Sequence, residues 1–141
     1  MPSLVATSRM QIGRMRGWLR DRNGVVAQLT ALSALHPPYA ALVANMRSLE
    51  AAADALAGGA DAASSFVAAR GSLLGLGLRW DAAAVALDAA FTVGAADPLV
   101  AAGLLEARQL YAELRAAPYL ELADALLAAA EAAPPLERAP S

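Results

Sequence analysis

The chain has 141 residues and a formal net charge of −2, and 58% of its residues are apolar while 17% are charged. This balance excludes intrinsic disorder as the general state, because the apolar fraction is large enough to form a core. The absence of cysteine excludes disulfide and zinc–thiolate frameworks, and the single histidine, His36, excludes a multi-histidine metal site. The length predicts one domain over residues 1–133, followed by a disordered tail over residues 134–141.

Apolar residues recur at the i, i+3 and i+4 spacing of a helix almost throughout, and no alternating strand pattern interrupts them. The expected helices cover residues 3–21, 25–35, 38–57, 62–78, 80–93, 98–115 and 118–133. Alanine, the strongest helix former, fills 39 positions, and the short connections are typical of antiparallel helix hairpins. The predicted fold class is therefore all-α.

Several helix ends carry recognisable signals. We expect Asn23-Gly24 to end the first helix, because glycine accepts a left-handed cap, and Pro37-Pro38 to end the second. Asp97 followed by Pro98 is typical of a helix start. The first helix is expected to be an ordinary amphipathic one, with an apolar stripe made of Leu4, Ile12, Met15 and Leu19.

Three glycines, Gly71, Gly75 and Gly77, interrupt the fourth predicted helix. A glycine inside a helix costs about 0.5–1 kcal/mol relative to alanine, so these positions need a compensating role. We predict that they allow a neighbouring helix to approach closely. A flexible or functional turn is the alternative.

An internal repeat links two of the predicted helices. A shift of 40 residues superposes two small–large–small patterns, which are Ala83, Leu87 and Ala90 on Ala123, Leu127 and Ala130. Small residues on either side of a larger one let a helix lie close to its hairpin partner. The pattern therefore suggests repeated hairpins of similar size.

Residues 78–83, with the sequence LRWDAA, resemble the turn and second-helix start of tetratricopeptide-type repeats. Residues 107–127 resemble the closing repeat in the C-terminal helical region of bacterial LuxR-type and adenylate-cyclase-linked signalling ATPases. The resemblance covers roughly residues 66–130, although the repeat spacing is nearer 40 than the usual ~34 residues. It implies about seven helices in antiparallel hairpins, stacked as a short right-handed solenoid.

The resemblance also implies a function. Nothing in the chain corresponds to an ATPase, cyclase or helix-turn-helix domain, so we expect a non-enzymatic protein–protein interaction module of a bacterial signalling or transcription-regulatory protein. In such a stack the first helices of the hairpins line a groove that can hold a peptide or partner helix. The expected partner-binding residues are Arg70, Arg108, Gln109 and Tyr111. Tyr111 and Tyr119 are expected to pack on each other or to line the same surface, no cofactor is expected, and an unfinished end of the stack predicts self-association.

The alternative is a helical protein that binds anionic lipid or nucleic acid through its basic N-terminal helix. Residues 1–22 carry a charge of +4, and Arg9, Arg16 and Arg20 lie near one stripe with Trp18 alongside. The sequence pI of about 5.3 argues against this use, because dedicated nucleic-acid binders are strongly basic. Polar residues and prolines interrupt the uncharged segment 23–46, so we expect no membrane span and a cytoplasmic location.

Catalysis is not expected. His36 precedes Pro37-Pro38 in a predicted turn, and acid pairs such as Glu121 with Asp124 have the spacing of a solvated helix face. The glycines at positions 71, 75 and 77 match neither a phosphate-binding loop nor a dinucleotide fingerprint.

Overall fold

The computed structural model describes residues 2–34 and 39–132, which form seven α-helices and no strand. The helices are α1 (Pro2–Trp18), α2 (Arg22–Ser33), α3 (Ala40–Leu56), α4 (Ala62–Gly75), α5 (Arg79–Thr92), α6 (Pro98–Glu113) and α7 (Ala117–Ala132). The all-helical prediction is confirmed for this part of the chain. His36 and the expected tail at residues 134–141 lie outside the described residues.

The turn between α1 and α2 lies earlier than predicted. Arg20 takes the left-handed conformation, with φ at 60°. Asp21 then caps α2, because its carboxylate accepts a hydrogen bond of 3.0 Å from the backbone N–H of Gly24. Asn23-Gly24 therefore lies in the first turn of α2, and the prediction of a helix end there is wrong.

The start of α6 follows its prediction. The Asp97 carboxylate accepts hydrogen bonds from the backbone N–H groups of Leu99 at 2.8 Å and Val100 at 3.4 Å. Pro98 occupies the first helical position, where a missing N–H costs nothing. The N-cap that was read from the sequence is confirmed.

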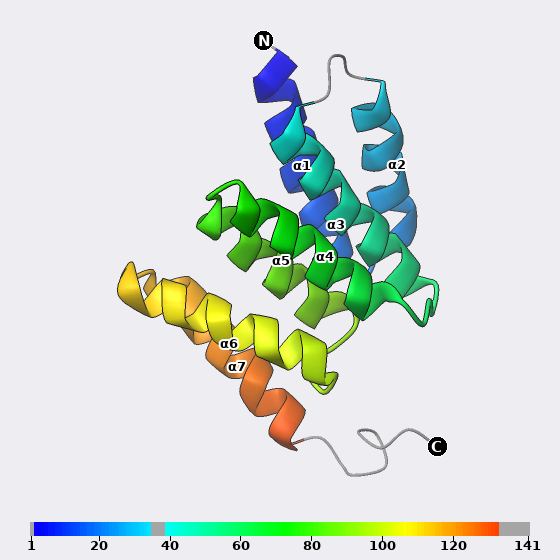
Figure 1. Cartoon of the computed structure of the whole chain (residues 1–141). Helices are drawn as coiled ribbons and strands as arrows, with labels where there is room; N and C mark the ends of the chain where they lie inside the picture. The colour runs from blue at the N-terminus through cyan, green and yellow to red at the C-terminus, as the bar shows by residue number, and fades with distance from the viewer. Residues whose placement is uncertain (1, 35–38, 133–141) are drawn as a thin grey trace.

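Each helix packs against the next one along the chain, and α3 also packs against both α1 and α5 (Figure 1). An additional contact joins α1 to α5, which are four helices apart in chain order. In Figure 1 the α1–α3 group and the α6–α7 pair lie at opposite ends of the molecule, with α4 and α5 between them. The central position of α5 explains why most of its residues are buried.

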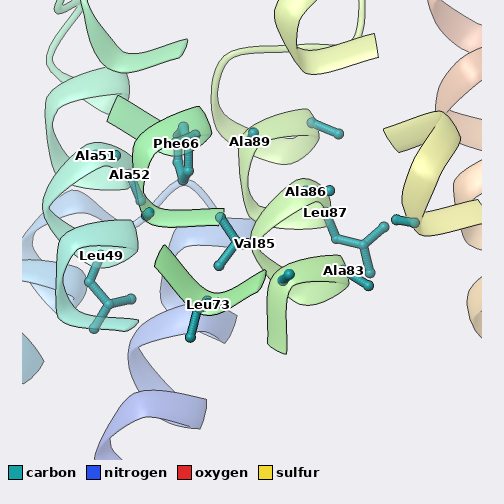
Figure 2. Packing of buried hydrophobic residues seen from close by; sticks show 14 of the residues in the cluster. Leu49, Ala51, Ala52, Phe66, Leu73, Ala83, Val85, Ala86, Leu87 and Ala89 are labelled. Atoms are coloured by element: carbon teal, nitrogen blue, oxygen red, sulfur yellow. The ribbon is translucent and has the colours of Figure 1, made fainter. Parts of the chain in front are cut away.

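The core consists mainly of alanine with larger side chains between (Figure 2). Leu49, Leu73 and Leu87 are among the largest side chains that are completely buried. Close approach of α1 to α3 depends on Gly13, where an added β-carbon would lie 2.8 Å from Leu49 Cδ1. Small residues thus allow close helix packing, as the alanine content suggests.

The glycines of α4 do not have the predicted packing role. A β-carbon added at Gly71, Gly75 or Gly77 would meet nothing within 4 Å, so the prediction of close helix approach is wrong. Gly77 instead ends α4 with φ at 76°. Its N–H donates to the Leu74 carbonyl at 3.0 Å, and the next N–H, of Leu78, donates to the Leu73 carbonyl at 2.9 Å, which is the hydrogen-bond pattern of a Schellman cap.

The apolar stripe of the first helix does not face the core. Leu4, Met15 and Leu19 are 63%, 60% and 69% exposed. The face that packs on the neighbouring helices is the opposite one, and its buried residues are Ala6, Met10, Gly13, Arg14 and Gly17. The predicted apolar stripe therefore does not form the inner face of α1, which consists instead of small residues, Met10 and a paired arginine.

Candidate functional site

A groove of about 280 Å³ lies between α4, α5 and α6. Its buried lining is apolar, and it comes from α5 and α6 as Ala82, Ala83, Ala107 and Leu110. The more accessible lining contains one apolar side chain, Leu74 of α4, and four polar ones: Arg70 from α4, Arg79 from α5, and Glu106 and Gln109 from α6. A concave apolar surface with a few convergent polar groups is typical of a binding site.

Arg70 is held closely against α6. Its side chain is only 16% exposed, and it pairs with the Glu106 carboxylate. The missing side chain of Gly103 leaves room for it, because an added β-carbon would be 3.3 Å from Arg70 Nε. Arg70 therefore bridges α4 and α6 and has little freedom to move.

Arg79 forms a looser bridge across the same groove. Its Nη2 lies 3.2 Å from Glu113 Oε2, and the two side chains are 60% and 47% exposed. An exposed ion pair of this kind contributes about 0–1 kcal/mol, because water screens the attraction. A carboxylate from a ligand can therefore replace Glu113 at small cost.

Two of the four predicted partner-binding residues, Arg70 and Gln109, lie together in this groove. Arg108 lies elsewhere, because its Nε pairs with Asp124 on α7. Tyr111 is buried in the core, where a partner cannot reach its side chain.

Sequence reasoning missed two other groove residues, Arg79 and Glu106. Their ion pairs join positions 34 and 36 residues apart, Arg79 to Glu113 and Arg70 to Glu106. Opposite charges separated by nearly one repeat are the signal that could have identified them.

An aromatic cluster joins the start of α5, the end of α6 and the start of α7. The Trp80 ring lies edge-on to Tyr111 and Tyr119, with centroid distances of 5.5 and 5.1 Å. Tyr111 and Tyr119 stack at 5.3 Å, which confirms that they pack on each other. Burial raises the pKa of Tyr111 and the neighbouring Tyr119 adds to the shift, so its hydroxyl stays neutral in the core.

A buried polar network joins α1, α3 and α5. Arg14 Nε donates to both carboxylate oxygens of Asp88, at 3.0 and 2.9 Å, and Trp18 Nε1 donates to Asp88 Oδ1 at 2.7 Å. Arg14 Nη2 also donates to Asn45 Oδ1 at 3.2 Å. Burial raises the pKa of Asp88, and this effect exceeds the opposing attraction of Arg14 and the hydrogen bonds from Arg14 and Trp18. Because both oxygens of Asp88 already have partners, the network serves to hold the three helices together.

This network was not predicted. Arg14 lies in a basic segment, which predicts an exposed side chain. Asp88 is a single acidic residue on a helix with many alanines, and nothing in its sequence neighbours predicts a partner. The available signal was that Asp88 is the only charged residue within residues 82–90, which otherwise consist of alanine, valine and leucine.

The arginines of the basic N-terminal segment have separate partners. Arg9 Nη1 donates to the Gln28 side chain at 3.4 Å, and Arg16 lies 3.5 Å from the Asp21 carboxylate. Arg20 Nη1 donates to the Phe91 carbonyl of α5 at 3.1 Å. Trp18 stacks on Phe91 at 4.7 Å, so its ring is part of the packing between α1 and α5.

Within residues 2–34 and 39–132, no group of three or more histidine, aspartate or glutamate side chains is arranged to hold a metal ion. None of the described helices is long and apolar enough to cross a bilayer.

Comparisons with models of known protein families, with curated proteins and with solved structures give no match for this chain. The ligand of the groove is therefore inferred from the chemistry of its lining.

Proposed function

We propose that this protein is a non-enzymatic protein–protein interaction module that binds a short peptide segment of a partner in the α4–α5–α6 groove. The observation that carries the proposal is that the exposed side chain of Leu74 and the exposed guanidinium of Arg79 line the same groove. An aliphatic side chain of the peptide packs on Leu74, and a neighbouring acidic side chain pairs with Arg79. Charge-assisted hydrogen bonds of this kind are stronger than neutral ones, which favours acidic over basic segments.

We also propose that α4–α5 and α6–α7 are successive hairpins of a tetratricopeptide-like solenoid. In such a solenoid a peptide-binding groove lies where this groove lies, between neighbouring hairpins. Two observations support this arrangement: the 40-residue shift that superposes Ala83 on Ala123, both of them buried, and the direct packing of α5 on α6. The first helices, α4 and α6, then line the groove, as in repeat proteins that hold peptides. The resemblance of residues 66–130 to signalling ATPases is the reason to propose a role in bacterial signalling or transcription regulation.

Two pools of fluorescent eight-residue peptides test the proposal. Both pools have a central leucine, flanked by glutamate and aspartate in one pool and by lysine and arginine in the other. We expect saturable binding, measured by fluorescence anisotropy, for members of the acidic pool only. R79E should weaken the best acidic peptide by about tenfold or more, because a hydrogen bond to a charged group contributes ~1.5–3 kcal/mol.

The matched control is R47E, a charge reversal at an exposed arginine on α3 that does not line the groove. This variant has the same net charge as R79E, and its affinity should equal that of the wild type. Equal binding of the two pools, or equal weakening by R47E and R79E, would show that the groove is not the site.

A further inference from the structure

The two terminal helices of the described chain leave surfaces uncovered. α1 and Leu19, the residue that follows it, have an exposed apolar surface that consists of Leu4, Val5, Ile12, Met15 and Leu19, named here the α1 stripe. α7 packs mainly against α6, and its opposite side is exposed. That side is rich in alanine, and we name Ala125, Ala128, Ala129 and Ala132 the α7 outer face.

The five side chains of the α1 stripe are large, apolar and between 41% and 69% exposed. Leu4, Ile12 and Met15 lie near one side of this 17-residue helix, which is about 25 Å long, Val5 lies beside Leu4, and Leu19 follows the last helical residue. Contiguous exposed apolar patches of this kind usually mark an interaction surface. The α1 stripe therefore needs an occupant.

The charges of α1 and α7 indicate which surface covers the α1 stripe. α1 contains Arg9, Arg14 and Arg16 and no acidic residue, and Arg9 and Arg16 are exposed. α7 has the opposite composition, with Glu121, Asp124 and Glu131 and no basic residue, and its length of 16 residues nearly matches that of α1. The two helices are thus complementary in charge and in length, although they lie at opposite ends of one molecule (Figure 1).

The internal repeat indicates what kind of element the α7 outer face accepts. On α5, Val85 and Ala89 are buried, and they line a small hollow together with Val100 and Gly103 of α6. The 40-residue shift places Ala125 and Ala129 of α7 at these two positions, but both are exposed. The next helix, α6, therefore covers Val85 and Ala89 on α5, whereas no described helix covers the equivalent Ala125 and Ala129 on α7.

We propose that the α1 stripe of one copy packs on the α7 outer face of a second copy, so that the protein self-associates head to tail. In this contact α1 covers α7 as α6 covers α5, with large aliphatic side chains of α1 lying on the alanines of α7. Arg9 and Arg16 then lie near Glu121 and Glu131 of the other copy. Because the two surfaces differ, association continues beyond a dimer unless a ring closes.

Two variants, each altered on one surface, test this arrangement by light scattering coupled to size exclusion. M15E/L19E alters the α1 stripe, and A125R/A129R alters the α7 outer face. All four positions are exposed, and glutamate and arginine are good helix formers, so folding should persist and is checked by circular dichroism. We expect wild-type mass to rise above 14.4 kDa with concentration, whereas each variant alone stays at that mass.

The decisive sample is an equimolar mixture of the two variants. Each variant keeps one intact surface, so the mixture should form a heterodimer of twice 14.4 kDa and stop there. Each double substitution should weaken self-association by about 100-fold, because it removes the burial of two apolar contacts or places charge among them. The control L76E/L105E changes two exposed leucines outside both surfaces and should associate like the wild type.

Three outcomes would overturn the proposal. Wild type that is monomeric at every concentration shows that the α1 stripe has another occupant, and co-sedimentation with phosphatidylglycerol vesicles would then identify a membrane surface. Association that M15E/L19E abolishes but A125R/A129R leaves intact shows an α1–α1 contact. A mixture in which both variants remain monomeric shows that the two surfaces do not meet. Peptide binding in the groove is independent of all three outcomes, since neither variant alters a groove residue.

Discussion

α5 makes two contacts that are stabilised in different ways. Its contact with α1 contains a buried ion pair, Arg14 with Asp88, whose side chains are 8% and 4% exposed. Its contact with α6 and α7 contains buried alanines and Trp80, whose ring lies edge-on to Tyr111 and Tyr119, and the Arg79–Glu113 ion pair there lies near the surface. One helix therefore combines a polar interior contact on one side with an apolar one on the other.

The two contacts should therefore tolerate different substitutions. A buried ion pair adds little net stability, because the loss of hydration offsets the attraction, but removal of one partner leaves an uncompensated charge. An apolar contact loses stability in proportion to the volume removed. The following predictions test this distinction, from the largest expected effect to the smallest.

R14M should destabilise the protein by about 3–5 kcal/mol, because Asp88 then remains buried without its cation. Urea unfolding followed by circular dichroism measures the change. The double variant R14M/D88L should recover most of the loss, since two apolar side chains replace the pair. If the double variant is as unstable as R14M, the ion pair itself stabilises the protein, and the loss in R14M does not come from leaving Asp88 buried without a partner.

Y111A should cost about 3 kcal/mol, because it removes a completely buried ring and leaves a cavity between Trp80 and Tyr119. Y119A, at a partly exposed ring in the same stack, should cost only about 1 kcal/mol. The same unfolding experiment measures both. Equal losses for the two variants would show that the stack behaves as one unit and not as separate contacts.

The stability difference between wild type and D88N should depend on pH. Burial raises the folded-state pKa of Asp88 above its ordinary value of 3.8, so the stability that this carboxyl contributes is present below pH 3.8 and is lost as the pH rises through its folded-state pKa. The free energy of unfolding of the wild type minus that of D88N should therefore fall with rising pH. A difference that increases with pH would mean that Arg14 outweighs burial.

R108A should have the smallest effect, about 0.2–1 kcal/mol, because the Arg108–Asp124 pair is nearly half exposed on both sides. High salt should reduce even this loss, since it screens exposed charges. Unfolding midpoints at low and high salt measure it. A loss as large as that of R14M would show that an exposed ion pair contributes as much as the buried one.

Much of the helical fold could be predicted from local sequence. The Asp97–Pro98 start was correct, because a cap depends only on its own side chain and the next few backbone groups. The α1–α2 turn was misplaced, because Arg20 takes a conformation that the neighbouring Asn23-Gly24 favours more strongly by residue type.

The candidate site was only partly predictable. Arg70 and Gln109 were found from the helices expected to line a groove, but Arg79, on α5, was not. The burial of Tyr111 could not be inferred, because it also depends on the ring of Trp80 in α5, which lies far away in the sequence.

The sequence by itself determined that the chain is helical and where most helices lie, since propensity, periodicity and caps act over a few residues. Only the tertiary structure decided which face of each helix is buried. Met15 and Leu19 have the spacing of a core stripe, yet Gly13 and Arg14 face inward, because α5 supplies a carboxylate to Arg14 and a β-carbon at position 13 would lie 2.8 Å from Leu49 of α3. Such partners lie tens of residues away, beyond the range of any local pattern.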